Sequence, residues 1–447
     1  MKQNKRPSIC IVSNREIIPI LLGLAEEYRD LGCNVSFLGA DEFTCQLVKQ
    51  FGFPVIKRPS QRSLIYRAEM RGFEEICKMD IKFTSLGIPL KKFWQRYFCK
   101  RANYFKNWLD RVGDQIDRDL IIVFNGVQFF ERIVVNKFKE EGRKTIFIEN
   151  GLFPKTAQFG KSGVNAFLEI RTIPDCDLAR GVSFEAVENF VNDLRNEFSE
   201  LKGEEGSNYL LKYKLNKYHA VVCFVKILFF DVPFLFFEFL SKAPFFIKRR
   251  FSLPKKNRGF SSGLPDRYVF FPLQVSADSQ LLVHANDLSI EEAIFMLNKV
   301  VAKMSPSCRL VIKEHPMERN INYNNLRTRF PEICWIKGVP LDEIIQNSLC
   351  VITINSSVGL QALFYNKPVI CLGNALYGRK GVAATAENID ELEKILLASK
   401  FCFSNKELIY RFLYHLYHFH SISYDRSSVT KDQLHQMAIK LIGEINE

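Results

Sequence analysis

Short, continuously apolar segments that alternate with amphipathic ones constrain this chain more than any other feature of its sequence. The first series of apolar segments comprises Ser8–Asn14, Asn34–Gly39, Leu120–Gly126 and Lys144–Gly151. Between them lie stretches with helical periodicity, such as Ile17–Leu31 and Phe129–Glu141. Strands that are apolar on both faces and separated by helices predict a parallel sheet covered by helices on both sides. We therefore expect a Rossmann-like, doubly wound first domain.

A second series of the same kind begins after Gly263. Its expected strands are Arg267–Gln274, Arg309–Pro316, Leu349–Ser357 and Lys367–Gly373, and its expected helices cover residues 289–304 and Val358–Tyr365. The length of 447 residues fits two or three domains of ~100–200 residues each. The sequence thus predicts an α/β chain with two doubly wound, Rossmann-like domains that face a central cleft, where ligands of open α/β folds bind.

We expect the first domain over residues 1–205, an insertion over 206–262, the second domain over 263–400, and helices over 401–447 that pack back onto the core. The insertion is Phe-rich and ends in basic residues, but charges and prolines break its apolar run, so it is a poor spanning helix. It fits a hairpin in the interface of an anionic membrane; the alternative is a buried helix pair with a basic exit loop. The predicted membrane-contacting residues are Phe229, Phe230, Phe236, Phe237, Lys248, Arg249 and Arg250.

The net charge and the cysteine pattern limit which classes of partner and which cellular compartment we expect. The chain has 62 Lys+Arg against 49 Asp+Glu, and this net charge of +13 favours anionic partners such as nucleotides, acidic glycans, anionic lipids or nucleic acid. The 12 cysteines are scattered, without CxxC pairs or zinc spacing, which indicates reduced thiols and no metal site. The N-terminus lacks the features of a signal peptide, so we expect a cytoplasmic protein. Walker A and G-x-G-x-x-G patterns are also missing, which disfavours classical ATPases and dinucleotide enzymes.

Two expected strands of the second series end on residues that suit a phosphate. Arg309–Pro316 closes with Lys-Glu-His-Pro, and Leu349–Ser357 closes with Asn-Ser-Ser before a helix. A histidine, a lysine and the N-terminus of a serine-capped helix can all donate hydrogen bonds to phosphate oxygens. The plain alternatives are a turn histidine and an ordinary serine N-cap. Taking the two strands as neighbours, we predict a nucleotide-phosphate site made by Lys313, His315, Pro316, Asn355, Ser356 and Ser357.

Glu149 is the one carboxylate that ends an expected first-series strand and is followed directly by a turn containing glycine. We expect Asn150 and Gly151 to adopt left-handed backbone conformations that turn the carboxylate towards the cleft, and a long polar loop to follow. Such a carboxylate suits a general base or a nucleophile. The alternative is a turn with a solvated glutamate.

The order of these motifs resembles the capsule polysaccharide biosynthesis and export family, which includes capsular Kdo (3-deoxy-D-manno-octulosonate) transferases. The motifs are FNG, FIENGLFP, FFPLQVSADSQ, IKEHP and INSSVGLQALFYNKPVICLG, and the likeness covers Leu120 to Gly381. The resemblance implies a GT-B-like fold, a CMP-activated acidic sugar as donor, and no metal or other cofactor. It also implies that His315 and Pro316, with Ser356 and Ser357, hold the CMP.

The likeness is greatest to the branch that adds the first Kdo to a phosphatidylglycerol-type lipid. This implies a lipid or glycolipid acceptor at the inner face of the bacterial cytoplasmic membrane, with other capsule assembly proteins as possible partners. Related two-module transferases carry Glu-Asp-Gly, with the aspartate acting on the anomeric carbon; here that position is Asn150, so retention of configuration does not carry over. Our hypothesis is that Glu149 is the catalytic carboxylate. The residues expected to line the sugar and acceptor sites are Asn125, Gln128, Asn150, Gln274, Asp278 and Gln280.

The sequence therefore predicts a metal-independent glycosyltransferase that uses a CMP-activated acidic sugar. One alternative is a transferase of the same fold with another donor, such as CMP-sialic acid or a UDP-sugar. Another is a non-catalytic capsule export or assembly protein. A nucleic-acid-binding protein is disfavoured, because the positive charge is spread along the chain and its clearest cluster lies beside Phe-rich sequence.

Overall fold

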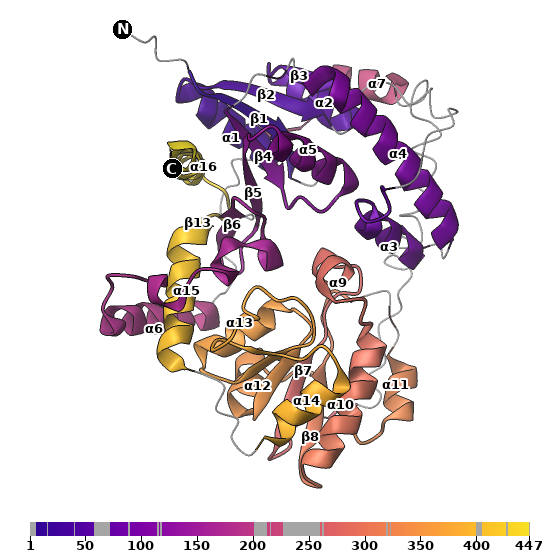
Figure 1. Cartoon of the computed structure of the whole chain (residues 1–447), viewed down its shortest axis with the longest axis vertical. Coiled ribbons are helices and arrows are strands. Elements are labelled where there is room, and N and C mark those ends of the chain that lie inside the picture. Colours follow the sequence, from indigo (N-terminus) through magenta and orange to yellow (C-terminus); the bar gives the residue numbers. More distant parts are fainter. Residues whose placement is uncertain are drawn as a thin grey trace. The chain divides into compact units, whose positions relative to one another are not determined.

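The chain folds into two compact units (Figure 1). Unit 1 comprises Met1–Val164, Lys202–Pro244 and Ser421–Glu447, and unit 2 comprises Asn165–Leu201 and Phe245–His420. The computed structural model describes residues 6–15, 17–39, 41–57, 72–87, 90–113, 116, 119–200, 212–214, 216–226, 260–261, 263–318, 321, 323–398, 405–425 and 428–446.

Unit 1 is built on a seven-stranded sheet in the order β13-β6-β5-β4-β1-β2-β3. Its strands are β1 (Ser8–Val12), β2 (Asn34–Gly39), β3 (Val55–Lys57), β4 (Leu120–Phe124), β5 (Lys144–Asn150), β6 (Thr156–Gly160) and β13 (Ser421–Ser423). The strands from β5 through β4 and β1 to β3 run parallel, whereas β6 and β13 add an antiparallel edge. The carboxyl ends of β5, β4 and β1 therefore lie side by side.

Helices cover both faces of this sheet, as the continuous apolar strands require. They are α1 (Ile18–Asp30), α2 (Glu42–Gln50), α3 (Lys78–Gly87), α4 (Lys91–Val112), α5 (Phe129–Glu140), α7 (Lys217–Lys226) and α16 (Lys431–Asn446). Alternate strand residues enter different core clusters: Ile9 and Ile11 pack with residues of α1 and α16, while Cys10 and Val12 pack with residues of α4 and α5. The period of two along β1 thus divides its side chains between the two layers.

Unit 2 has a six-stranded, wholly parallel sheet in the order β12-β11-β10-β7-β8-β9. Its strands are β7 (Tyr268–Pro272), β8 (Arg309–Lys313), β9 (Cys334–Ile336), β10 (Cys350–Thr353), β11 (Val369–Cys371) and β12 (Ala384–Thr385). Its α-helices are α6 (Phe184–Glu200), α9 (Ser279–His284), α10 (Ile290–Met304), α11 (Asn324–Arg329), α12 (Leu341–Asn347), α13 (Ser357–Phe364), α14 (Ile389–Leu397) and α15 (Lys406–His420). Three short 3-10 helices, Asn165–Phe167, Glu169–Arg171 and Asp175–Asp177, precede α6.

The expected α/β class with two doubly wound sheets is confirmed, but the stretch after Gly151 is not the long polar loop that we expected. It turns back as β6, which pairs antiparallel with β5 so that Glu149 lies opposite Gln158. All five residues of β6 are buried. A strand of five residues that includes a glutamine has no clear apolar run, so the sequence pattern hid it.

The units also differ from the expected domain boundaries. Residues 165–201 group with unit 2 rather than with the first domain, because α6 packs on α15. Of the expected C-terminal helices, α16 packs on α1 within unit 1, whereas α15 belongs to unit 2. Most of the expected insertion, including all seven predicted membrane-contacting residues, lies outside the described residues. In the described part of the chain, no helix combines the length and the apolar character that crossing a bilayer requires.

Candidate functional site

The polar residues predicted for unit 1 lie where β4 and β5 end. After β4, Asn125 and Gly126 both have left-handed backbone conformations, with φ of 37° and 74°. The Asn125 backbone N–H donates to the carbonyl of Ile148 in β5 (2.9 Å), and its side-chain Oδ1 accepts from the Val127 N–H (3.0 Å). Asn125 therefore ties the turn after β4 to the neighbouring strand.

The turn after β5 differs from the expected one. Neither Asn150 nor Gly151 has a positive φ, and the left-handed residue of the β5–β6 hairpin is Lys155, with φ of 50°. Gly151 is required for another reason: its N–H donates to the Thr156 carbonyl (2.8 Å), and a Cβ on Gly151 would collide with the Thr156 backbone. The glycine thus serves close approach of the two strands.

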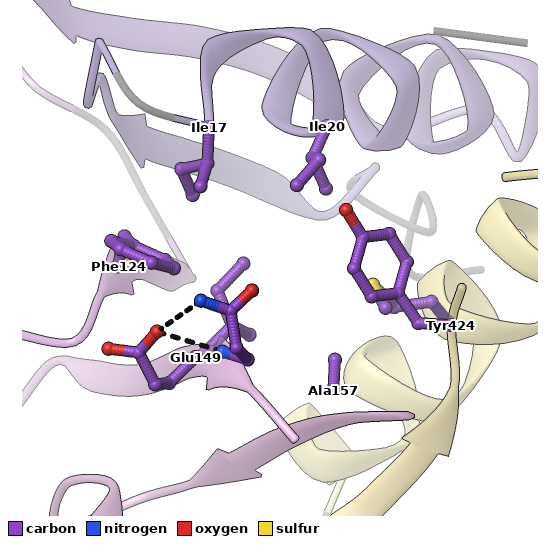
Figure 2. A pocket seen from close by; sticks show the side chains of 9 residues that line it. Ile17, Ile20, Phe124, Glu149, Ala157 and Tyr424 are labelled. Atoms are coloured by element: carbon purple, nitrogen blue, oxygen red, sulfur yellow. Dashed lines mark hydrogen bonds between the residues drawn. The ribbon is translucent and has the colours of Figure 1, made fainter. Parts of the chain in front are cut away.

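Glu149 remains at the end of β5 with its carboxylate held by the next residue. Its Oε1 accepts from the backbone N–H of Asn150 (2.8 Å) and from the Asn150 side-chain Nδ2 (3.1 Å), as Figure 2 shows. Asn150 is oriented in turn, because its carbonyl accepts from Gln158 Nε2 (2.9 Å). This small network fixes the orientation of one carboxylate at the edge of the sheet.

Glu149 and Asn150 contribute a carboxylate and an amide to a mostly apolar pocket within unit 1 (Figure 2). The pocket is an open hollow of about 280 Å³, a volume that includes some open solvent. Its other lining residues come from α1, β4, β5, β6 and the C-terminal segment, and they are Ile17, Ile20, Phe124, Ile148, Ala157, Tyr424 and Met437. One oriented carboxylate in an apolar wall suits proton abstraction from, or attack on, a ligand that is itself partly apolar.

A second carboxyl group, Glu131, lies behind this edge of the sheet and was not predicted. It is fully buried, and its Oε1 accepts from Asn14 Nδ2 (3.0 Å). This hydrogen bond joins the end of β1 to α5. Its Oε2 accepts from the backbone N–H of Gln128 (3.3 Å), the N-cap of α5, so Gln128 has a structural role here. Burial raises the pKa of Glu131 to about 8, and the charges of Asp80 and Glu149 add to that rise.

Glu131 gives a prediction for the pH dependence of stability. Folding favours the neutral form of Glu131. The contribution of this group to the free energy of unfolding is therefore fully present below the ordinary pKa of 4.5 and is lost as the pH rises towards about 8. Within that window, the free energy of unfolding of the native chain should fall relative to that of Glu131→Gln by about 1.4 kcal/mol per pH unit, the value for one proton. Urea unfolding at several pH values from 5 to 8 measures this difference. Glu140→Gln, an exposed change on the same helix, is the matched control; parallel curves for the native chain and Glu131→Gln would contradict the prediction.

In unit 2, three of the predicted lining and binding residues form one hydrogen-bonded cluster. Gln274 follows β7 and Asn355 follows β10, and both side chains are buried. Gln274 Nε2 donates to Asn355 Oδ1 (2.8 Å), and the Asn355 backbone N–H donates to Gln274 Oε1 (3.2 Å). Asn355 Nδ2 then donates to the carbonyl of Gln280 in α9 (2.8 Å). These contacts join the ends of two strands to α9.

His315 lies after β8 as a partly buried donor of defined orientation. Its Nδ1 accepts from the Met317 backbone N–H (3.1 Å), so in the neutral ring Nε2 carries the hydrogen. Burial lowers the pKa of His315, against the opposing effect of Asp278 and Glu318. At neutral pH this histidine is therefore an uncharged Nε2–H donor. Asp278 caps α9 by accepting from the Gln280 N–H (2.9 Å), and burial raises its pKa.

The serines after β10 begin α13. Ser356 is the N-cap, whose Oγ accepts from the Val358 N–H (3.2 Å), while Ser357 is exposed in the first turn. The Ser356 carbonyl accepts from the buried Tyr377 hydroxyl, and a Cβ at Gly359 would collide with that tyrosine. The Ser356 cap and the Tyr377 hydroxyl thus hold the N-terminus of α13 in place.

Two details of the predicted phosphate site differ from expectation. Strands β8 and β10 are not neighbours, because β7 lies between them; chain order does not reveal sheet order in a doubly wound fold. The Lys313 ammonium donates to the carbonyl of Val339, and burial lowers its pKa. Pro316 is exposed beside His315. The binding roles of these residues remain predictions.

Four residues of these networks were missed by sequence reasoning: Asn14, Glu131, Glu318 and Tyr377. Asn14 ends the first apolar segment, and Asn125 is the penultimate residue of a later one, so the same strand-end rule points to Asn14. The buried Glu318 accepts from the backbone N–H groups of Ser276 (2.6 Å) and Ile321 (3.2 Å), contacts that carry no sequence signal. Within the described ranges, no group of three or more His, Cys, Asp and Glu side chains is arranged to hold a metal ion.

Comparison with known proteins identifies relatives of this chain. Residues 254–411, which make up most of unit 2, match the family of capsule polysaccharide biosynthesis proteins. The capsule polysaccharide export protein KpsS of Escherichia coli is 26% identical over 325 residues, which cover 64% of this chain and 77% of that protein. The capsule polysaccharide modification protein LipB of Neisseria meningitidis is 33% identical over 131 residues, 27% of this chain and 31% of that protein.

Solved structures give weaker likenesses. The beta Kdo 2,4 transferase of Thermosulfurimonas dismutans KpsC has 11% identity and a TM-score of 0.46, with 98% of this chain and 99% of that chain covered. The beta Kdo 2,7 transferase of the same KpsC has 12% identity and a TM-score of 0.36, covering 76% and 89%. The fold assignment rests on the two sheets described above and not on these likenesses. The sequence match therefore shows a likeness to the capsule polysaccharide biosynthesis proteins over residues 254–411.

Proposed function

We propose that this chain is a metal-independent glycosyltransferase that transfers Kdo or a similar acidic sugar from a CMP-activated donor to a lipid or glycolipid acceptor in capsule or surface polysaccharide synthesis. The match of residues 254–411 to the capsule polysaccharide biosynthesis proteins supports the pathway. The proposal of a CMP-activated sugar rests on His315. This neutral histidine offers an Nε2–H group for hydrogen bonding at the end of a parallel strand, in the same unit as the serine-capped α13.

Unit 2 supplies the groups that a nucleoside monophosphate sugar needs. The single phosphate of a CMP-sugar can accept from His315 Nε2 and from groups at the N-terminus of α13, where the helix dipole favours negative charge. A neutral donor and a helix terminus are sufficient in principle for one phosphate, and on this basis we propose that no metal is used.

Unit 1 supplies the proposed catalytic group. Glu149 acts as the base or the nucleophile, and Asn150 holds the carboxylate in place through two N–H donors. The apolar walls of its pocket, with side chains such as Ile17, Ile20 and Phe124, suit the apolar part of a glycolipid acceptor. A lipid acceptor would require the enzyme to work at the cytoplasmic face of the membrane.

A non-catalytic role in export is the alternative, because the relative KpsS is named a capsule polysaccharide export protein. Thermal unfolding with CMP, UDP, GDP or ADP at matched concentrations separates the two. We expect selective stabilisation by CMP, by about 2.7 kcal/mol at a concentration one hundred times the Kd. His315→Ala should abolish that stabilisation.

The matched control is His219→Ala, which removes a histidine from α7 of unit 1 and should leave the CMP effect intact. Stabilisation by UDP instead of CMP would replace the donor. If none of the four nucleotides stabilised the chain, the transferase proposal would be wrong and the export role favoured.

A further inference from the structure

Basic side chains gather on the outer face of the first three turns of α4. Lys91, Lys92, Arg96 and Lys100 are all exposed, and none of them makes an ion pair with any described residue. The only acidic residue of α4, Asp110, lies in its last turns, where it pairs with Lys106 (2.6 Å). The α4 basic face, defined by these four cations, is therefore uncompensated by charge on its own helix.

The inner face of the same helix is firmly anchored. Trp94, Phe98, Phe105 and Trp108 are buried in the core cluster that α4 shares with α5 and one side of the unit 1 sheet. Residues on the outer face follow a spacing of four, from Lys92 through Arg96 to Lys100, which places them on one stripe. Because the inner face fixes the rotation of the helix, this stripe is held pointing away from the core.

Exposed apolar side chains accompany the basic face at its N-terminal end. Leu90 is 56% exposed and Phe93 is 41% exposed, while the following Trp94 is buried. The Phe93 ring stacks on that of Tyr97, with centroids 6.4 Å apart and planes 9° from parallel. Lysines and arginines beside exposed Leu and Phe form the combination that binds the headgroup region of an anionic bilayer.

We propose that the α4 basic face, with Leu90 and Phe93, docks this chain onto an anionic phospholipid surface. The cations lie against lipid phosphates, and the two apolar side chains enter the boundary between headgroups and acyl chains. An anionic nucleic acid would satisfy the cations but would leave Leu90 and Phe93 without an apolar partner. The proposal is separate from the predicted contact of the Phe-rich segment, and it rests on the proposed function only in that a lipid acceptor requires a membrane.

The test is co-sedimentation of the full chain with phosphatidylcholine vesicles that contain or lack phosphatidylglycerol. We expect binding to the anionic vesicles alone, weakened by added salt. The triple variant Lys92→Gln, Arg96→Gln, Lys100→Gln should bind on the order of 100-fold more weakly, since each cation near such a surface contributes about a fivefold factor. The pair Leu90→Ser, Phe93→Ser should also weaken binding, whereas it would not weaken binding to a DNA duplex.

The control is a triple Lys→Gln variant at Lys49, Lys299 and Lys394, exposed lysines on three other helices, which lowers the net charge equally. If both triple variants bind the vesicles as the native chain does, or if both lose binding equally, the proposal is wrong. If the α4 variant loses DNA binding but keeps vesicle binding, the face binds nucleic acid and the proposal is also wrong. Stabilisation by CMP, measured on the same variants, reports on the proposed function independently, because His315 lies in unit 2.

Discussion

Glu149→Gln should lower the turnover of sugar transfer by about 10²–10⁴-fold, the range for loss of a positioned general acid or base. The change keeps the shape of the side chain, and the amide oxygen can still accept from the Asn150 N–H as the carboxylate does. What is lost is the negative charge and the ability to take a proton or attack a carbon. The KM for the CMP donor should change little, because the residues proposed to bind CMP belong to unit 2.

Glu140→Gln is the matched control for this experiment, since it removes an exposed carboxylate of the same unit and should leave turnover unchanged. Steady-state rates at varied donor concentrations separate kcat from KM. Asn150→Ala should give a smaller loss, because it removes one of the two N–H donors and leaves the carboxylate in place. An active Glu149→Gln enzyme would exclude Glu149 as the catalytic carboxylate.

Strands buried on both faces were predicted from the sequence because their signal is local. The segment Ser8–Asn14 reads as one apolar run, and the structure places β1 at Ser8–Val12 in the interior of its sheet, between β4 and β2. Helix α5 begins at Phe129 as its periodicity predicts. Such elements are specified by consecutive residues, so a single sequence is sufficient to find them.

Edge strands and sheet order depend on contacts between distant residues, and here the predictions from the sequence were wrong. β6 is stabilised by pairing with β5 and with β13, whose Ser421 lies opposite Gln158, more than 250 residues away in the chain. Likewise, β7 separates β8 from β10 although the phosphate-type motifs follow one another in sequence. Local propensity carries no information about either pairing.

The residues of the candidate site also divide into those with a local sequence signal and those that depend on distant contacts. The strand-end rule singled out Glu149, Gln274 and Asn355, and the structure places all three where parallel strands end, while their roles in a site remain predictions. The partner of Asn14 is Glu131, 117 positions away, and only the structure reveals that this N3 residue of α5 is wholly buried. A glutamate three residues after a helix N-cap is otherwise read as an ordinary capping residue.

Asn355→Leu should destabilise unit 2 by about 2–5 kcal/mol, although the two side chains are similar in size. The change leaves Gln274 Nε2 without its acceptor and the Gln280 carbonyl without its donor, at a cost of about 1–3 kcal/mol for each buried polar group. Asn374→Ala is the matched control: it also removes an asparagine that donates to another residue, Asn286 Oδ1 at 3.0 Å, but that bond is exposed and its loss should cost less than about 0.5 kcal/mol.

A double-mutant cycle shows whether Gln274 and Asn355 act as one unit. Gln274→Leu also breaks both of the hydrogen bonds that join the two residues, so the double variant loses them only once. The cost of the double change should therefore be smaller than the sum of the single costs by about 0.5–3 kcal/mol, as measured by urea unfolding. Because Ser356 follows Asn355 directly and caps α13, the single variant should also weaken stabilisation by CMP. Additive costs would mean that the two amides are independent, and the cluster would then not hold the N-terminus of α13 in place.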